Sequence, residues 1–306
     1  MKNVIKMKRL AVGCMIAGFA ALVVSCLGMA QAIGDSADEM GDSKGARALS
    51  QSAHSIERAL EDITPEQEYY IGRAVGANLL TNYRLYQDDP DLALYLNEIT
   101  AAVAINSKKP EIFNGYHAAV LDSEEINAFS TSGGHIFVTR GLVDCAASED
   151  TLAAVIAHEI AHIQLQHSIM AIKSNRVVDA FATTGSSLAG LALSDLAGIL
   201  DEAANDIVSA MQEGYSQTQE FAADTLALEL LADAGYEPSS LIVMLQALKQ
   251  IQSQRNGELA NGLKGFARTH PSPDDRIAQL ERPLRQYRDA TRDTRAYREA
   301  RFNTHK

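Results

Sequence analysis

A His-Glu-x-x-His pattern inside an apolar stretch constrains this chain more than any other feature. The stretch covers residues 151–167, contains no glycine or proline, and places His158 and His162 four residues apart. Its apolar content predicts a buried helix, on which residues four apart share one face, so both imidazoles can bind one metal ion. Glu159 lies roughly 100° further around that helix, beside the metal, where a base for a water molecule belongs. Because the pattern also arises by chance, a metal site requires a third ligand.

Two side chains are candidates for the third ligand. His167 lies nine residues after His158 and about half a turn away from the metal-facing side, which argues against it. Glu220 lies in a helix predicted over residues 212–234, followed by small residues that would let two helices pack closely. Two histidines and a glutamate with an open fourth position are typical of catalytic zinc. Asp224, one turn after Glu220, can accept the second N–H of a ligand histidine. A solvated acidic face is the alternative.

The remaining patterns predict a mostly helical α+β fold. Apolar runs on both sides of a Gly-Gly turn predict a hairpin over residues 126–139, after a short strand at 118–122. Ser148 is expected to cap the helix that carries the two histidines. Prolines predict an extended loop over residues 268–276, because a residue before proline is pushed out of the α region. Further helices are predicted over residues 65–82, 90–105, 239–253 and 274–280.

The first residues have the pattern of a secretory signal. Four basic residues precede an apolar run over residues 10–30 that is rich in small side chains. The run contains a lipobox-like sequence ending at Cys26, which would then carry lipid, and an Ala-x-Ala cleavage pattern ending at Ala32. An uncleaved anchor is a third option, since about 20 apolar residues can span a bilayer. We favour the lipoprotein, and all three options predict that the rest of the chain is exported.

Composition assigns the remaining segments. Residues 1–32 are assigned to the signal peptide and 33–60, rich in glycine, serine and aspartate, to a flexible tether. Residues 177–200 are rich in small, uncharged side chains and predict two helices packed on the core, with a mobile cover or a membrane-touching surface as the alternative. The basic tail 283–306 predicts a solvated helix or a frayed end. A net charge of −12 and the absence of tryptophan argue against nucleic acid as a partner.

Four motifs resemble the HtpX/Ste24/Oma1-type zinc metallopeptidases, metallopeptidase family forty-eight. The resemblance implies a gluzincin fold over residues 61–282, in which a compact helical domain has a small sheet and hairpin lining the cleft. Because the chain lacks multiple membrane-spanning segments and a tetratricopeptide-like repeat, it looks more like the exported, periplasmic single-domain members. The motifs are the segment from Asn127 to Gly141, His158-Glu-Ile-Ala-His162, Gln219-Glu-Phe-Ala-Ala-Asp224 and Thr269-His-Pro-Ser-Pro-Asp-Asp-Arg276.

The resemblance also implies a mechanism. One zinc ion per chain would be held by His158, His162 and Glu220, with Glu159 as the base that takes a proton from water and passes it to the leaving amine. His270, held extended before a proline, would face the metal. It would either stabilise the oxyanion or occupy the open ligand position; loop packing is the alternative.

The resemblance further predicts the surroundings of the metal. Arg276 lies one helical turn inside the element that follows His270, and with Asp224 it would support the ligands. A strand would bind an extended peptide substrate by edge pairing; its residues are Asn127, Ala128, Phe129 and Ser130.

The sequence therefore predicts an exported zinc endopeptidase, and the resemblance implies that it degrades misfolded or misassembled envelope proteins. The alternative is a zinc-containing chaperone-like or binding module with a closed cleft. Glu159 argues against that alternative, because a purely structural metal site needs no base. The physiological substrate and the oligomeric state are not encoded in these patterns.

Overall fold

The computed structural model describes residues 64–170, 214–253, 270, 273–287 and 294–305. They form a mostly helical α+β unit with one small sheet, the fold class expected from the sequence. The predicted signal peptide, the tether, the proposed lipidation site at Cys26 and the segment 177–200 lie outside the described residues. Among the helices of the described residues, none has both the length and the apolar character needed to cross a membrane.

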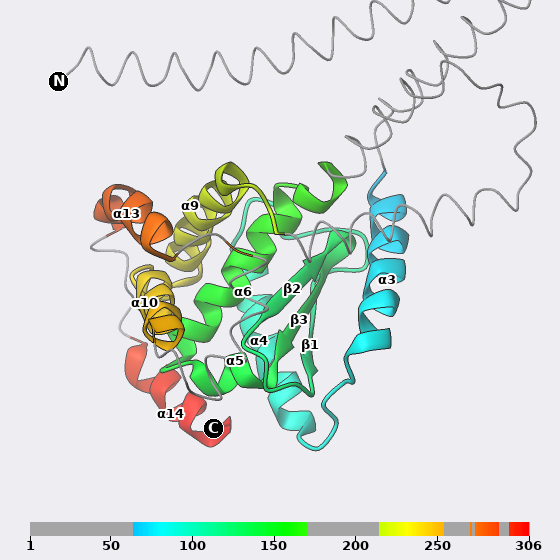
Figure 1. Ribbon diagram of the computed structural model, residues 1–306, viewed down its shortest axis with the longest axis horizontal. Helices are drawn as coiled ribbons and strands as arrows, with labels where there is room; N and C mark the ends of the chain where they lie inside the picture. Colours follow the sequence, from blue (N-terminus) through cyan, green and yellow to red (C-terminus); the bar gives the residue numbers. More distant parts are fainter. Residues whose placement is uncertain (1–63, 171–213, 254–269, 271–272, 288–293, 306) are drawn as a thin grey trace, which may run out of the picture. The chain divides into compact units, whose positions relative to one another are not determined.

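A three-stranded sheet lies between helices (Figure 1). The strand order is β1-β3-β2, where β1 (His117–Leu121) is parallel to β3 (His135–Thr139) and β2 (Ala128–Thr131) is antiparallel to it. The predicted hairpin is therefore confirmed, with a 3₁₀ turn, η1 (Ser132–Gly134), between its strands. This order places β2 at an edge of the sheet, as peptide pairing requires.

Helices cover both faces of the sheet, so nearly all strand residues are buried. On one face, α3 (Pro65–Asn82) packs at Gly76 against the ring of Phe137, and Tyr83, just after α3, packs 5.6 Å from Phe129 between ring centroids. On the other face, α4 (Pro90–Ile105) and α6 (Glu149–Gln164) enclose the main core. The strand residues that join this core are Ala118, Val120, Ala128, Ile136 and Val138.

Close contact between α3 and the hairpin turn depends on glycine. A Cβ on Gly72 would lie 1.7 Å from the carbonyl oxygen of Ser132. The hydroxyl of Thr131 donates to the Gly72 carbonyl at 3.0 Å, which holds the two backbones together. A larger side chain at position 72 would therefore push α3 away from the sheet.

The two predicted metal-bearing helices pack directly against each other. Ser148 caps α6, as predicted, and forms a capping box with Thr151. The second helix, α9 (Gln217–Ala234), begins five residues later than the predicted start at 212, because Ser216 caps it with Gln219. Both helices carry alanines with no exposed surface, which allows their backbones to approach. These alanines are Ala153, Ala154, Ala157, Ala161, Ala223 and Ala227.

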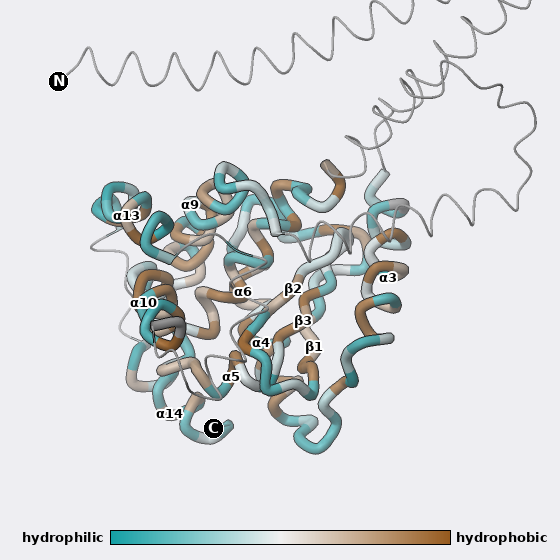
Figure 2. The backbone as a smooth tube through the Cα atoms, viewed as in Figure 1, coloured by the Kyte–Doolittle hydropathy of each residue, from teal (hydrophilic) through white to brown (hydrophobic). Residues whose placement is uncertain are grey.

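The last helices pack around α6 and α9. After the short α5 (Arg140–Cys145), which leads into α6, the later elements are α10 (Ser240–Ser253), α13 (Pro273–Leu284), η3 (Arg285–Tyr287) and α14 (Arg295–His305). Figure 2 shows that α14 is largely hydrophilic, as expected for the tail 283–306. The expectation of a solvated helix holds for most of α14, whose residues are largely exposed. The helix is docked rather than free, however, because Arg298 and Phe302 are buried. The reason is a pair of acidic residues at the start of α6.

Glu149 and Asp150 hold α14 in place. Arg298 donates to Asp150 at 3.0 Å, and Arg301 donates to Glu149 at 2.7 Å. Glu149 also accepts from the hydroxyls of two tyrosines, Tyr95 and Tyr236. Two buried carboxylates at a helix N-terminus are thus compensated by cations from a segment about 150 residues later.

Candidate metal centre and catalytic site

Three side chains from α6 and α9 meet at one point. His158 and His162 lie one turn apart on α6, with their Nε2 atoms 3.0 Å from each other. Glu220 in the first turn of α9 presents Oε2 at 3.5 Å from His158 Nε2 and Oε1 at 3.3 Å from His162 Nε2. All three are almost completely buried. The structure therefore brings together the three residues that the sequence predicted as metal ligands.

His270 joins these three residues from the segment before α13. Its Nδ1 lies 2.9 Å from Glu220 Oε2, and one ligand atom from each of the four side chains lies within 4.8 Å of the others. Its ring centroid is 5.5 Å from that of His158. His270 thus points at the group and does not merely fill space in its loop.

The donor atoms fit a divalent metal ion such as zinc. Tetrahedral ligands at roughly 2.0–2.1 Å from zinc are about 3.3–3.4 Å apart, close to the separations between His158, His162 and Glu220. Among the described residues, Oε1 of Glu220 is buried and receives no hydrogen bond. A buried carboxylate oxygen without a donor is unfavourable unless a cation binds it. Nitrogen and carboxylate ligands are a set that zinc accepts.

Asp224 and Arg276 support His158. Asp224 Oδ1 lies 2.9 Å from His158 Nδ1, on the side of the ring away from Glu220. Arg276 of α13 donates to both carboxylate oxygens of Asp224, at 2.8 and 2.6 Å. This bidentate pair fixes Asp224, and Asp224 fixes the orientation of the His158 ring.

Electrostatics make the site attractive to a cation. Burial opposes ionisation of Glu220, but the three neighbouring histidines outweigh it and hold its pKa well below the usual range. Burial and Arg276 oppose protonation of His158, yet the carboxylates of Asp224 and Glu220 raise its pKa to about 9. Burial lowers the pKa of His162. The raised pKa of His158 means that its surroundings stabilise positive charge, which a bound metal would supply in place of the proton.

Glu159 lies next to this group without belonging to it. It is 3% exposed and is not one of the four clustered residues. Its charge nevertheless acts on His162 and on Arg276, so the carboxylate is close to the site. A buried carboxylate beside a metal position can exchange a proton with a bound reactant.

His162 has two aromatic partners that the sequence does not predict. His167 lies outside the four-residue group, as its position on the predicted helix indicates, but its Nδ1 lies 2.8 Å from Nδ1 of His162. Burial lowers the pKa of His167 to about 3. The ring of Tyr215 stacks on His162, with centroids 4.3 Å apart and planes 23° from parallel. A third histidine five residues after the His-Glu-x-x-His pattern is a signal that the sequence offers for His167. The sequence offers no such signal for Tyr215, which lies before α9.

The predicted substrate strand is present at the sheet edge. The observed strand is β2 (Ala128–Thr131), so Asn127 lies just before it. The four predicted residues, Asn127 to Ser130, are all buried. Asn127 bonds inward through its backbone, since Thr139 N–H donates to the Asn127 carbonyl at 3.0 Å. Bonding direction alternates along an antiparallel strand, so the backbone groups of Ala128 and Ser130 point to the outer edge. The N–H of Ala128 donates there to Oδ1 of Asn127 at 3.0 Å. The hydroxyl of Ser130 is buried without a hydrogen-bond partner among the described residues.

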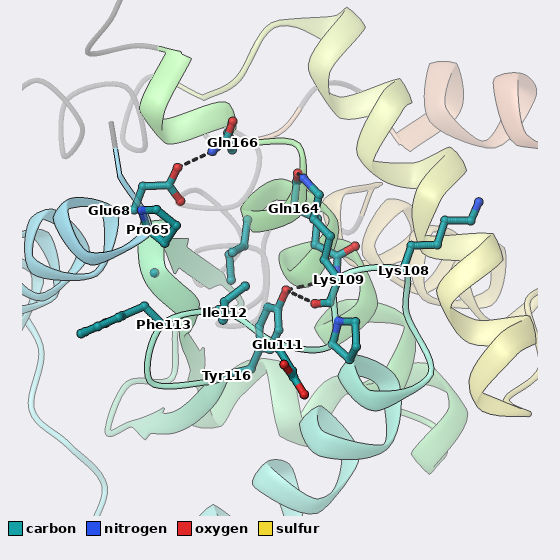
Figure 3. A pocket seen from close by; sticks show the side chains of 13 residues that line it. Pro65, Glu68, Lys108, Lys109, Glu111, Ile112, Phe113, Tyr116, Gln164 and Gln166 are labelled. Atoms are coloured by element: carbon teal, nitrogen blue, oxygen red, sulfur yellow. Dashed lines mark hydrogen bonds between the residues drawn. The ribbon is translucent and has the colours of Figure 1, made fainter. Parts of the chain in front are cut away.

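A separate cavity of about 680 Å³ lies beside the end of α6 (Figure 3). Its walls come from the start of α3, from the loop after α4 and from the last residues of α6, including Ile163 and Gln164. None of the four clustered residues lines it. The carbonyl of Gln164 accepts a hydrogen bond from Lys109 at 2.8 Å, which ties the loop to the helix end.

Comparisons with known proteins agree with this geometry. A sequence profile described as "Peptidase family M48" matches residues 89–284. The beta-barrel assembly-enhancing protease of Escherichia coli O157:H7 is 27% identical over 273 residues, which cover 85% of this chain and 50% of that protein. The mitochondrial metalloendopeptidase OMA1 of Schizosaccharomyces pombe is 27% identical over 229 residues, 74% of this chain and 64% of that protein. The chain thus spans about half the length of the Escherichia coli relative that it matches.

Proposed function

The chain belongs to peptidase family M48, and we propose on this basis that it is a zinc-dependent endopeptidase. The observation that carries the proposal is the buried group of His158, His162, Glu220 and His270, with Glu159 beside it. In the proposed site, His158, His162 and Glu220 hold one zinc ion. A purely structural metal site would not need the adjacent carboxylate of Glu159.

The proposed reaction is hydrolysis of a peptide bond. Bound zinc supplies Lewis acidity toward the scissile carbonyl and the attacking water. Glu159 accepts a proton from that water and delivers it to the nitrogen of the leaving amine. Asp224 and Arg276 keep the His158 ring in place throughout, because their bidentate pair is buried.

The proposed substrate is an extended peptide segment that pairs with β2. The carbonyl of Ala128 and the backbone groups of Ser130 are directed outward and would bond to it, while Asn127 and Phe129 hold the strand to its neighbours. The N–H of Ala128 is already bonded to the side chain of Asn127. Edge pairing recognises the backbone of the substrate and not its side chains, so it would accept unfolded segments of many sequences. We therefore propose misfolded or misassembled proteins of the cell envelope as substrates. The secretory pattern before Ala32 supports this location. The Escherichia coli relative is named for a role in beta-barrel assembly, which fits such substrates.

Cleavage of casein with zinc quantification tests the function. Purified wild-type protein should contain about one zinc per chain and cleave casein, whereas Glu159→Gln should keep the zinc and lose turnover by several orders of magnitude. The matched control is Glu66→Gln on the exposed side of α3, which should cleave like wild type. A chain without zinc would refute the proposal. Zinc without cleavage by either protein would favour the alternative, a binding module with a closed cleft.

We further propose that His270 occupies the fourth ligand position in the state described here. Its Nδ1 lies as close to Glu220 as a hydrogen bond allows, inside the four-residue group. If His270 closes the site, His270→Ala should weaken zinc binding and raise casein turnover. If it instead stabilises the oxyanion, turnover should fall by about 10²–10³. Unchanged zinc affinity together with unchanged turnover would show that His270 only packs its loop.

A further inference from the structure

His167 lies beside the metal cluster although a continuous helix would direct it elsewhere. Five helical residues turn the chain by roughly 500°, so a continuous α6 would leave His167 far around the helix from His162. The helix instead ends at Gln164, and Gln166 takes a φ of 55°. A new helical turn over residues 167–170 follows. This change of direction brings the ring of His167 to within 4.9 Å of the His162 ring, measured between centroids.

Gln166 is held in this conformation from two sides. A left-handed backbone is unfavourable for a residue other than glycine and persists only where the surroundings fix it. Figure 3 shows the side chain of Gln166 hydrogen-bonded to Glu68 of α3. Its backbone N–H donates to the carbonyl of Ile163 at 3.0 Å, and its carbonyl accepts from Met170 at 2.9 Å. The fold thus maintains local strain at the point that directs His167 toward the cluster.

The contact between the two imidazoles determines where His162 carries its proton. Nε2 of His162 faces His158 and Glu220, whereas its Nδ1 faces Nδ1 of His167 at 2.8 Å. When Nε2 binds a metal, the remaining ring proton is on Nδ1 and is donated to His167. A hydrogen bond of this kind fixes the tautomer and the orientation of a ligand histidine.

Tyr215 restrains the same ring in a second direction. Its ring lies almost parallel to His162, so it opposes tilting of the imidazole, while the hydrogen bond to His167 opposes rotation within the ring plane. Tyr215 also lies 5.6 Å from the His167 ring, between centroids. His162 is therefore held by an acceptor at one edge and an aromatic ring on one face.

We infer that His167 is a positioning residue for His162, with Tyr215 fixing the plane of that ring; the inference rests on the proposed metal site. The two ligand histidines then have different supports. His158 donates to a carboxylate held by Arg276, and His162 donates to an imidazole. Loss of His167 removes no ligand but leaves His162 free to rotate or to change tautomer, which weakens the metal site.

Zinc affinity tests this inference without measuring activity. The dissociation constant for Zn²⁺ would be measured by chelator competition on the full purified chain. His167→Leu should weaken binding about 10–100-fold, whereas His167→Asn, whose side-chain oxygen can still accept the Nδ1 proton, should retain most of the wild-type affinity. The control is His117→Leu at an exposed position of β1, which should bind like wild type. Equal affinity of His167→Leu and wild type would overturn the inference, as would equal losses in the two His167 variants.

Two further measurements separate positioning from folding. Metal-free His167→Leu and His167→Asn should unfold at the same temperature, and a lower unfolding temperature of His167→Leu with unchanged zinc affinity would overturn the inference. NMR of the zinc-loaded protein should show the Nδ1 proton of His162 in a hydrogen bond in wild type but not in His167→Leu, and an unchanged Nδ1–H signal in His167→Leu would overturn it. If the wild type binds no zinc, the proposed function fails as well. If the wild type binds zinc and cleaves casein while His167→Leu binds equally well, only this inference fails.

Discussion

Arg276 is the largest completely buried side chain of the described residues, and its charge is balanced by the site that it supports. Its guanidinium bonds both oxygens of Asp224, and its Nη1 lies 3.5 Å from Glu220. Burial opposes ionisation of Arg276, but the carboxylates around it, above all that of Asp224, outweigh burial and raise its pKa above the usual range. Removing one partner of a buried pair is costlier than removing both, because it leaves a buried charge without compensation.

We therefore expect Arg276→Leu to destabilise the protein by about 3–5 kcal/mol. The measurement is urea unfolding of the metal-free protein, so that loss of zinc does not contribute. The free energy of unfolding of Arg276→Lys should lie between those of wild type and Arg276→Leu, because lysine retains the charge but cannot form the bidentate pair. Arg282→Leu, at an exposed position of the same helix, is the control. Equal unfolding midpoints for the Leu variants at 276 and 282 would contradict the role assigned to this buried charge.

At the scale of single elements, caps and turns were predictable because their signals are local. Ser148, Pro65 and the Gly133-Gly134 turn each act on the residues next to them, and the structure has helices and a hairpin at these places. The predicted start of α9 is too early, because the helical sequence pattern continues upstream of the residue that caps the helix, Ser216. Local signals thus define an element well, provided that the correct cap is recognised.

The C-terminal helix shows what local signals cannot provide. α14 buries Arg298 and Phe302, one turn apart, and an arginine on the buried face hides the amphipathic pattern. Its partners, Asp150 and Glu149, read as ordinary acidic residues in the first turn of a helix, where they also favour the helix dipole. Only the spatial contact between segments about 150 residues apart shows that these charges form pairs.

We expect Arg298→Ala to destabilise the protein by about 3–5 kcal/mol, because Asp150 would remain buried without its cation. Arg295→Ala on the same helix is the matched control: Arg295 is highly exposed and its pair with Glu299 is solvated, so the change should cost less than about 1 kcal/mol. Thermal unfolding of the two variants measures the difference. A helix that only covers the surface would lose little stability in either variant.

At the scale of the whole molecule, the metal should stabilise the fold that creates its site. The ligands come from α6, α9 and the segment before α13, so binding links elements that are distant in the sequence. The sequence predicted these ligands because their chemistry is restrictive: few residue types bind zinc, and their spacing on a helix is fixed. It did not predict the support of His162 by His167 and Tyr215. This support depends on the backbone conformation of Gln166 and on the position of Tyr215 just before α9.

Chelation should therefore lower the thermal unfolding temperature. Free zinc at 1,000 times its dissociation constant contributes about 4 kcal/mol to stability, and EDTA would remove this contribution. Glu159→Gln should show the same shift as wild type, since Glu159 is not a ligand in the proposed site. His158→Ala should show a much smaller shift. Equal shifts in wild type and His158→Ala would mean that zinc binds elsewhere.

The pairing of α6 with α14 has a consequence for the order in which the protein is completed during synthesis. Residues 149 and 150 are made well before residues 298 and 301, and until those arginines emerge the start of α6 carries two carboxylates without their cations. A chain still being made therefore lacks the contacts that fix the start of the helix bearing both histidines.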